Sequence, residues 1–182
     1  MIAIPALDPS TAPPAAAEAL SKARAAFGSV PNLTRVMANS PAVLHGYLAL
    51  SEALTEGVLE AEARERIALL VAEENRCAYC LSAHTQVAEQ LLRLSLDEIA
   101  ASRRGQSDEP RIHALLQLAS AINSNRGEVS DQVIESTRSA GISDAEIAEV
   151  VAHVAANAFT NYFAKTARVD IDFPYVEPRG AA

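Results

Sequence analysis

Two cysteines and a histidine lie close together near the middle of the 182-residue chain. Cys77, Cys80 and His84 stand at positions i, i+3 and i+7, which fall on one face of a helix. A Cys-X-X-Cys pair at a helix start can close a disulfide, and the unpaired N–H groups there favour a thiolate, the form that attacks peroxides and disulfides. His84 follows Cys80 by four residues and is near enough to exchange a proton with its sulfur. The pattern indicates thiol redox chemistry.

A glutamate, Glu65, precedes this group on a strongly apolar stretch. Residues 67–72 (IALLVA) are apolar without a break, which is typical of a helix buried on all sides. On a helical wheel Glu65 falls among small and apolar residues, where a desolvated carboxylate would be suited to proton transfer. Periodicity leaves the alternatives open, because Glu65 could instead pair with Arg64 or Arg66, or be solvated in the first helical turn.

Other interpretations of the cysteine pair are less favourable. The two cysteines could be core residues beside an unrelated histidine, or zinc ligands. Structural zinc needs four ligands, usually in two paired clusters, and the fourth would have to come from Glu65 or from His45, His113 or His153. These three histidines stand singly in apolar helices, as satisfied core or interface histidines do. We therefore expect no metal. No Gly-rich phosphate loop is present, so we expect no cofactor either.

The elements that must position these residues are helical. The chain contains 37 Ala, 7 Gly and no Trp, and 49% of its residues are apolar. Because Ala favours helices and disfavours strands, this composition predicts an all-α fold of about seven to eight helices. The expected helices cover residues 15–27, 41–56, 60–75, 77–94, a short one after Ser95, 111–125, 130–140 and 143–166, while 29–40 is expected as a connection. Ser95 and Ser143 each open a capping box.

The chain length favours one domain. We expect an N-terminal arm over residues 1–14, a single helical domain over 15–168 and an extended tail over 169–182. The pattern also contains a weak sign of internal duplication. The predicted helix with Glu65, followed by Cys77–Cys80, is loosely similar to the predicted helix with Glu149, followed by residues 161–164. Composition alone could produce this match.

Charge and hydropathy exclude several classes of partner. The formal net charge is −8 and no basic patch is visible, so nucleic acid is not expected as a partner. No apolar run reaches the roughly 18 residues of a membrane span, and the first residues lack the features of a signal peptide. We therefore expect a cytoplasmic protein without membrane contact, in a compartment that keeps thiols reduced.

Glu65, the Cys77-X-X-Cys80 pair and His84 resemble the core motif of the AhpD-like alkylhydroperoxidases of the carboxymuconolactone decarboxylase superfamily. This core covers about residues 40–100. The tail from Asn161 to Pro174 is also similar to a peroxidase-related subgroup, so the resemblance spans most of the chain. It implies a compact AhpD-like helical subunit that assembles into a homo-oligomer, a trimer or hexamer.

The resemblance also implies a reaction. Cys80 would attack an organic hydroperoxide or hydrogen peroxide, Cys77 would resolve the sulfenate, and Glu65 and His84 would form a proton relay, partly through water. A dithiol reductant or a lipoyl- or thioredoxin-like protein would then reduce the Cys77–Cys80 disulfide. The chain departs from the family at Tyr79, where well-characterised members carry a second histidine. A phenol with an ordinary pKa of about 10 does not shuttle protons near neutrality, so the relay is expected to be shorter.

Two other functions stay open from the sequence. One is a carboxymuconolactone decarboxylase-type lyase acting on a lactone acid, although that branch generally lacks the cysteine pair. The other is a non-enzymatic redox-sensing module in which the disulfide acts as a switch. A peroxide-consumption assay with a dithiol reductant separates both from the peroxidase.

Overall fold

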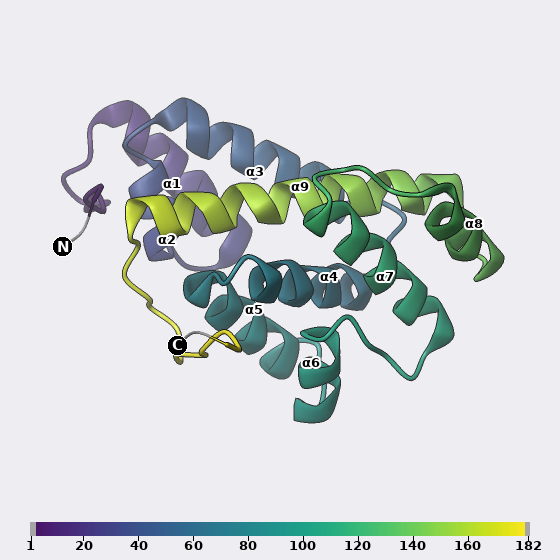
Figure 1. Cartoon of the computed structure of the whole chain (residues 1–182). Helices are drawn as coiled ribbons and strands as arrows, with labels where there is room; N and C mark the ends of the chain where they lie inside the picture. Colours follow the sequence, from purple (N-terminus) through teal and green to yellow (C-terminus); the bar gives the residue numbers. More distant parts are fainter. Residues whose placement is uncertain (1–2, 181–182) are drawn as a thin grey trace.

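The computed structural model describes residues 3–180, and this part of the chain folds into nine α-helices without a strand (Figure 1). The all-α prediction is confirmed. The helices are α1 (Pro14–Phe27), α2 (Asn32–Met37), α3 (Pro41–Thr55), α4 (Ala61–Glu74), α5 (Ala78–Gln90), α6 (Leu96–Ser102), α7 (Pro110–Ser124), α8 (Asp131–Ser139) and α9 (Asp144–Ala167). No helix in residues 3–180 is long and apolar enough to cross a membrane.

Several helix starts lie where their sequence signals predict them. Ser95 and Ser143 each form a complete capping box, in which the serine side chain accepts from the N3 backbone and the N3 glutamate accepts from the serine backbone. Pro41 occupies the first turn of α3, directly after Ser40. Local hydrogen bonding therefore sets these boundaries without help from distant residues.

Two helix predictions need correction. Helix α2 falls inside residues 29–40, which were expected to be a connection. It has only six residues, too few to show a helical period, and its first backbone N–H donates to Asp172 Oδ2 over 2.9 Å, a contact 140 residues away in sequence. Helix α5 ends at Gln90 rather than near residue 94, because Leu94 N bonds Ala88 O and Arg93 adopts a positive φ of 62°.

The two segments that suggested a weak internal duplication differ in where their helices end. Helix α4 ends at Glu74 and α5 begins after Cys77, so the first segment contains a turn. Glu149 and Asn161 instead lie on the single unbroken helix α9. The two segments therefore share composition but differ in backbone path.

Helix α4 lies at the centre of the molecule, packed against α5, α6, α7 and α9 (Figure 1). Its unbroken apolar run is buried on all sides, as predicted, with Ile67, Leu69 and Val71 fully buried. Leu69 and Ala72 belong to one apolar cluster, shared with α1, α2, α3 and α5. Ile67, Leu70 and Val71 belong to a second one, shared with α7 and α9. The helix that carries Glu65 is thus held from two sides.

The C-terminal segment after α9 runs back along α5 and is extended (Figure 1). Val176 N donates to Ser82 Oγ of α5 over 2.9 Å. The buried carboxylate of Glu73 accepts from Arg179 N over 2.6 Å and from Arg103 Nε over 2.6 Å. This segment therefore joins α4, α5 and the chain after α6.

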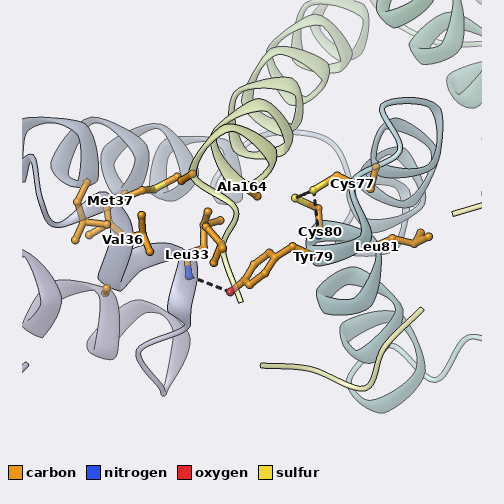
Figure 2. Packing of buried hydrophobic residues seen from close by; sticks show 14 of the residues in the cluster. Leu33, Val36, Met37, Cys77, Tyr79, Cys80, Leu81 and Ala164 are labelled. Atoms are coloured by element: carbon orange, nitrogen blue, oxygen red, sulfur yellow. Dashed lines mark hydrogen bonds between the residues drawn. The ribbon is translucent and has the colours of Figure 1, made fainter. Parts of the chain in front are cut away.

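Tyr79 completes the attachment of this segment. Its hydroxyl accepts from Leu33 N of α2 over 3.1 Å, and its ring meets Phe173 edge-on with centroids 5.5 Å apart. Figure 2 shows the ring directed toward Leu33, away from the sulfurs of Cys77 and Cys80. Burial raises the pKa of the Tyr79 phenol, which stays protonated near neutrality. Tyr79 therefore connects α5 to α2 and to the C-terminal segment.

We predict that Tyr79→Phe destabilises the fold and leaves thiol reactivity unchanged. The substitution leaves the N–H of buried Leu33 without its acceptor, which costs about 1–3 kcal/mol of unfolding free energy. Urea denaturation measures this loss, and Tyr162→Phe at an exposed position is the matched control, expected to stay within about 0.5 kcal/mol. Slower alkylation of the cysteines with unchanged stability would instead assign Tyr79 to the proton path.

Candidate active site

The turn between α4 and α5 brings the two cysteines together. Arg76 adopts a positive φ of 51°, and Cys77 N then bonds Ala72 O over 2.9 Å, so the chain reverses immediately before α5. Cys77 is the N-cap of α5, and its Sγ accepts from Cys80 N over 3.3 Å. The two Sγ atoms lie 2.7 Å apart, both as free thiols. A disulfide has an S–S length of about 2.05 Å, so the pair closes with a small sulfur movement.

Both thiols are buried, with Cys77 1% and Cys80 3% exposed, and their ionisation is linked. Hydrogen bonds from the Cys80 thiol and backbone N–H, together with the charge of His84, lower the pKa of Cys77 against the effect of burial. The hydrogen bond to Cys77, burial and the charge of Cys77 raise the pKa of Cys80. The pair therefore loses its protons one at a time. The sequence predicted that an N–H group at the start of this helix would stabilise a thiolate, and the structure has one, Cys80 N–H, directed at Cys77.

Glu65 and His84 form an ion pair next to the thiols. His84 Nδ1 donates to Glu65 Oε1 over 2.7 Å, with the two side chains 28% and 13% exposed. Burial disfavours the charged imidazole, but the charge and hydrogen bond of Glu65 outweigh it, so the pKa of His84 is raised. The alternative arginine partners are engaged elsewhere: Arg66 pairs with two other glutamates, and Arg64 donates to backbone carbonyls.

A pocket of about 170 Å³ opens beside this ion pair, lined by residues of α3, α4, α5 and α9. Glu65, His84, Tyr47 and Thr160 all contribute to its wall. Burial, followed by the charges of Cys80 and Glu65, raises the pKa of Tyr47 to about 12, so its phenol stays protonated near neutrality. The charge of Cys80 thus acts on Tyr47, a residue of the pocket wall.

The other three histidines are dispersed. His45 lines a hollow of about 810 Å³ and His113 one of about 570 Å³, neither lined by Cys77, Cys80, Glu65 or His84. In the part of the chain that the structure describes, no three His, Cys, Asp or Glu side chains gather to hold a metal.

His153 differs from the expectation of a satisfied core residue, because it lies in the wall of the pocket that Glu65 and His84 also line. Its buried Nε2 has no hydrogen-bond partner within residues 3–180, and the same is true of His45 Nε2. Burial, with a smaller effect of the Arg64 charge, lowers the pKa of His153. The residue is therefore neutral near pH 7 and belongs to the site.

Sequence reasoning also missed the α3 and α9 side chains around Cys80. Neither Tyr47 nor Thr160 was among the predicted site residues. Thr160 and Asn161 lie against Cys80, and the polar side chains of both act to lower its pKa, against the larger effect of Cys77. They are 80 or more residues from the cysteine in sequence and show no recognisable spacing. Only the packing of α5 against α9 reveals them.

A family model describes the segment that contains these residues. Residues 41–108 match the carboxymuconolactone decarboxylase family. A curated protein of Haemophilus influenzae, described as uncharacterized, is 51% identical over 49 residues. That match covers 26% of this chain and 43% of the Haemophilus protein, so the chain aligns with less than half the length of this relative.

Solved structures match over nearly the whole chain. A peroxidase-related protein of Ralstonia eutropha JMP134, described as an alkylhydroperoxidase AhpD core, has a TM-score of 0.82 at 23% identity, covering 94% of this chain and 92% of that one. A peroxidase-related protein of Silicibacter sp. TM1040 has a TM-score of 0.77 at 25% identity, covering 91% and 90%.

The debrominase Bmp8, in a complex with 2,3,4-tribromopyrrole, has the same fold, with a TM-score of 0.77 at 18% identity and coverage of 93% and 91%. The fold is therefore shared by proteins described as peroxidase-related and by a debrominase. The matched segment at residues 41–108 includes Glu65, both cysteines and His84, and the fold extends the likeness to the rest of the chain. Residues 41–108 thus match the carboxymuconolactone decarboxylase family, and the chain as a whole has the AhpD-like fold.

Proposed function

We propose that the protein is a thiol-dependent peroxidase that reduces organic hydroperoxides or hydrogen peroxide through a Cys77–Cys80 disulfide. The observation that carries this proposal is the contact of the two Sγ atoms at 2.7 Å beside the His84–Glu65 pair. The adjoining pocket of about 170 Å³ is of a size for a small hydroperoxide. A paired thiol, a proton donor and a small pocket are the components that this reaction requires.

In the first half of the reaction, the Cys80 thiolate attacks the terminal oxygen of the hydroperoxide and the O–O bond breaks. The sulfur takes that oxygen as sulfenic acid, and the alkoxide leaves as an alcohol after accepting a proton. The raised pKa of His84 keeps a proton available at the pocket, with Glu65 stabilising the charged imidazole. His84 and Glu65 thus act as the relay that delivers this proton.

In the second half, the Cys77 thiol attacks the sulfenic sulfur, the S–O bond breaks and water leaves. Because the sulfurs are already in contact, this step needs only a small movement of the side chains. An external dithiol, or a lipoyl- or thioredoxin-like protein, supplies the two electrons that restore both thiols.

The assignment of Cys80 as the attacking thiol rests on its place beside the pocket. Thr160, which lines the pocket, lies against Cys80, and the charge of Cys80 acts on Tyr47 in the same wall. In the reduced structure the first negative charge is favoured on Cys77. The shared proton must therefore pass from Cys80 to Cys77 before attack, over a sulfur–sulfur distance of 2.7 Å.

Two other activities are tested by the same assay. A decarboxylase-type lyase would consume a lactone acid without thiol oxidation, and a redox-sensing module would form its disulfide without multiple turnovers. A debrominase shares the fold, so a brominated pyrrole is a useful control substrate. Turnover of hydroperoxide with a dithiol reductant, and not of the other two compounds, supports the peroxidase. Failure to consume any hydroperoxide over many equivalents contradicts it.

We predict different roles for the two cysteines. Cys80→Ser abolishes peroxide reduction, because it removes the attacking sulfur. Cys77→Ser lets Cys80 react once and then stall as sulfenic acid or oxidise further, since no resolving thiol remains. Mass spectrometry after one equivalent of hydroperoxide measures both outcomes. A trapped sulfenic acid in Cys80→Ser, with none in Cys77→Ser, would reverse the roles.

We predict that Glu65→Gln keeps the fold and lowers the rate of Cys80 oxidation by about 10²–10⁴-fold, the range of a general acid–base contribution. Removing the carboxylate charge also lowers the pKa of His84, which an NMR titration of the imidazole measures. His84→Gln should lose a similar factor, and the double variant much less than the product, because the two residues act as a unit.

Glu73→Gln is the matched control for this experiment. Glu73 is a more deeply buried acid of α4, but it holds Arg103 and Arg179 rather than His84. This variant should lose stability and keep its rate of oxidation. An unchanged oxidation rate in Glu65→Gln would remove Glu65 from the mechanism.

We also predict a homo-oligomer, a trimer or a multiple of it. Large apolar side chains stay exposed on the single chain, including Leu50, Val151, Phe159 and Tyr162. Burying these side chains against further copies would stabilise the assembly. Sedimentation at micromolar concentration measures the mass, and a value near 19 kDa would contradict the prediction.

A further inference from the structure

A fully buried amide lies beside the attacking thiol, with a donor that is not engaged. Asn161, in the C-terminal part of α9, is 0% exposed. Its Nδ2 has no hydrogen-bond partner within residues 3–180, although the side chain lies against Cys80. Thr160 also lies there, but its hydroxyl already donates to Asn157 O over 2.9 Å. A buried, unsatisfied donor is costly and rare in a folded protein.

A chain of hydrogen bonds fixes which way this amide points. The carboxylate of Glu74 only accepts, so Asn123 directs its Nδ2 at Glu74 Oε2, over 2.7 Å. Asn123 Oδ1 is left to accept from Asn75 Nδ2 over 3.3 Å. The same Asn75 Nδ2 donates to Asn161 Oδ1 over 3.0 Å. The oxygen of Asn161 is thereby taken, and its two N–H bonds point away from Asn75.

We propose that Asn161 is a further catalytic residue of the thiol pair, whose Nδ2 donates to Cys80 Sγ when the negative charge moves to that sulfur. The proposal rests on the proposed function and extends it. After attack on the hydroperoxide, the same N–H group donates to the sulfenate oxygen. No bond other than hydrogen bonds forms or breaks at the amide.

A hydrogen bond from Asn161 would stabilise negative charge on Cys80, which Cys80 needs in order to act as the nucleophile. The N–H group at the start of α5 is directed to Cys77, which favours charge on the wrong sulfur for attack. Asn161 provides a second donor, directed to Cys80 instead of Cys77. Its amide needs no reorientation to donate, because Asn75 already holds it in place. A hydrogen bond to the ionised form favours that form. The position of the shared proton thus depends on the balance of the two donors.

Other charged and titratable groups also face the pair. They are His84 on α5, Glu65 on α4, Tyr47 on α3 and Lys165 on α9, while Tyr79 is directed to the opposite side of α5. None of these groups is itself altered when Asn161 alone is changed. A comparison of variants at this position therefore isolates the amide.

The test measures ionisation of Cys80 in a Cys77→Ser background, where Cys80 is the only thiol. Iodoacetamide labelling rates across pH give its pKa with and without Asn161→Leu, which keeps the branched shape of the side chain and removes the donor. We expect the pKa to rise by about one unit or more, so that labelling at pH 7 slows at least about tenfold. Ser102→Ala, another fully buried polar position remote from the thiols, is the control and should leave the pKa unchanged.

A second measurement does not depend on the folding of Asn161→Leu. In the Cys77→Ser protein, the side-chain NH₂ signals of Asn161 should shift in an NMR titration with the midpoint of Cys80 ionisation, while those of Asn123 stay constant. An unchanged labelling profile in Asn161→Leu, or Asn161 signals that do not respond to Cys80 ionisation, would overturn the proposal. Neither readout uses peroxide, so a failure of the peroxidase assay leaves this result to be judged separately.

Discussion

The geometry of the site depends on the turn at residues 75–77. This turn ends α4, provides the N-cap of α5 and holds Asn75 where its amide reaches α9. Lys165 of α9 secures the turn by donating to Asn75 O over 2.7 Å. Because the same three residues connect the helices that carry Glu65, the cysteines and Asn161, a change in this turn alters every distance in the site together.

Burial of the sulfurs explains why the environment of the pair is so asymmetric. Two adjacent anions in an apolar interior repel each other and are poorly solvated, so the pair carries one charge at a time. The surroundings then decide which sulfur bears it. The start of α5 favours Cys77, and side chains of α9 favour Cys80. The charge on the pair is therefore governed by two helices that meet only in the folded chain.

Much of this arrangement could be predicted from local sequence patterns. The capping boxes at Ser95 and Ser143 and the buried α4 depend on residues within one or two helical turns, and the structure has both where they were expected. The stripe of Cys77, Cys80 and His84 follows from helical spacing in the same way. The pairing of Glu65 with His84 was open between several partners, because a helical wheel gives neighbours on one helix only.

What could not be predicted depends on contacts across long stretches of chain. Helix α2 is held by Asp172, and Asn161 is oriented by Asn75, which no spacing in the sequence records. Tyr79 illustrates the same limit, because its contacts with Leu33 and Phe173 join it to segments far away in the sequence. Tertiary contacts decide the roles of these residues.

The order in which the chain emerges from the ribosome gives the C-terminal segment an additional significance. Residues 172–179 are synthesised after all nine helices, yet they bind α2 through Asp172, α5 through Val176 and α4 through Arg179. Contacts of such long sequence separation form slowly, because loop closure must come first. The cysteine pair is therefore synthesised before the segment that braces its helix, and α5 gains these contacts only once residues 172–179 have left the ribosome.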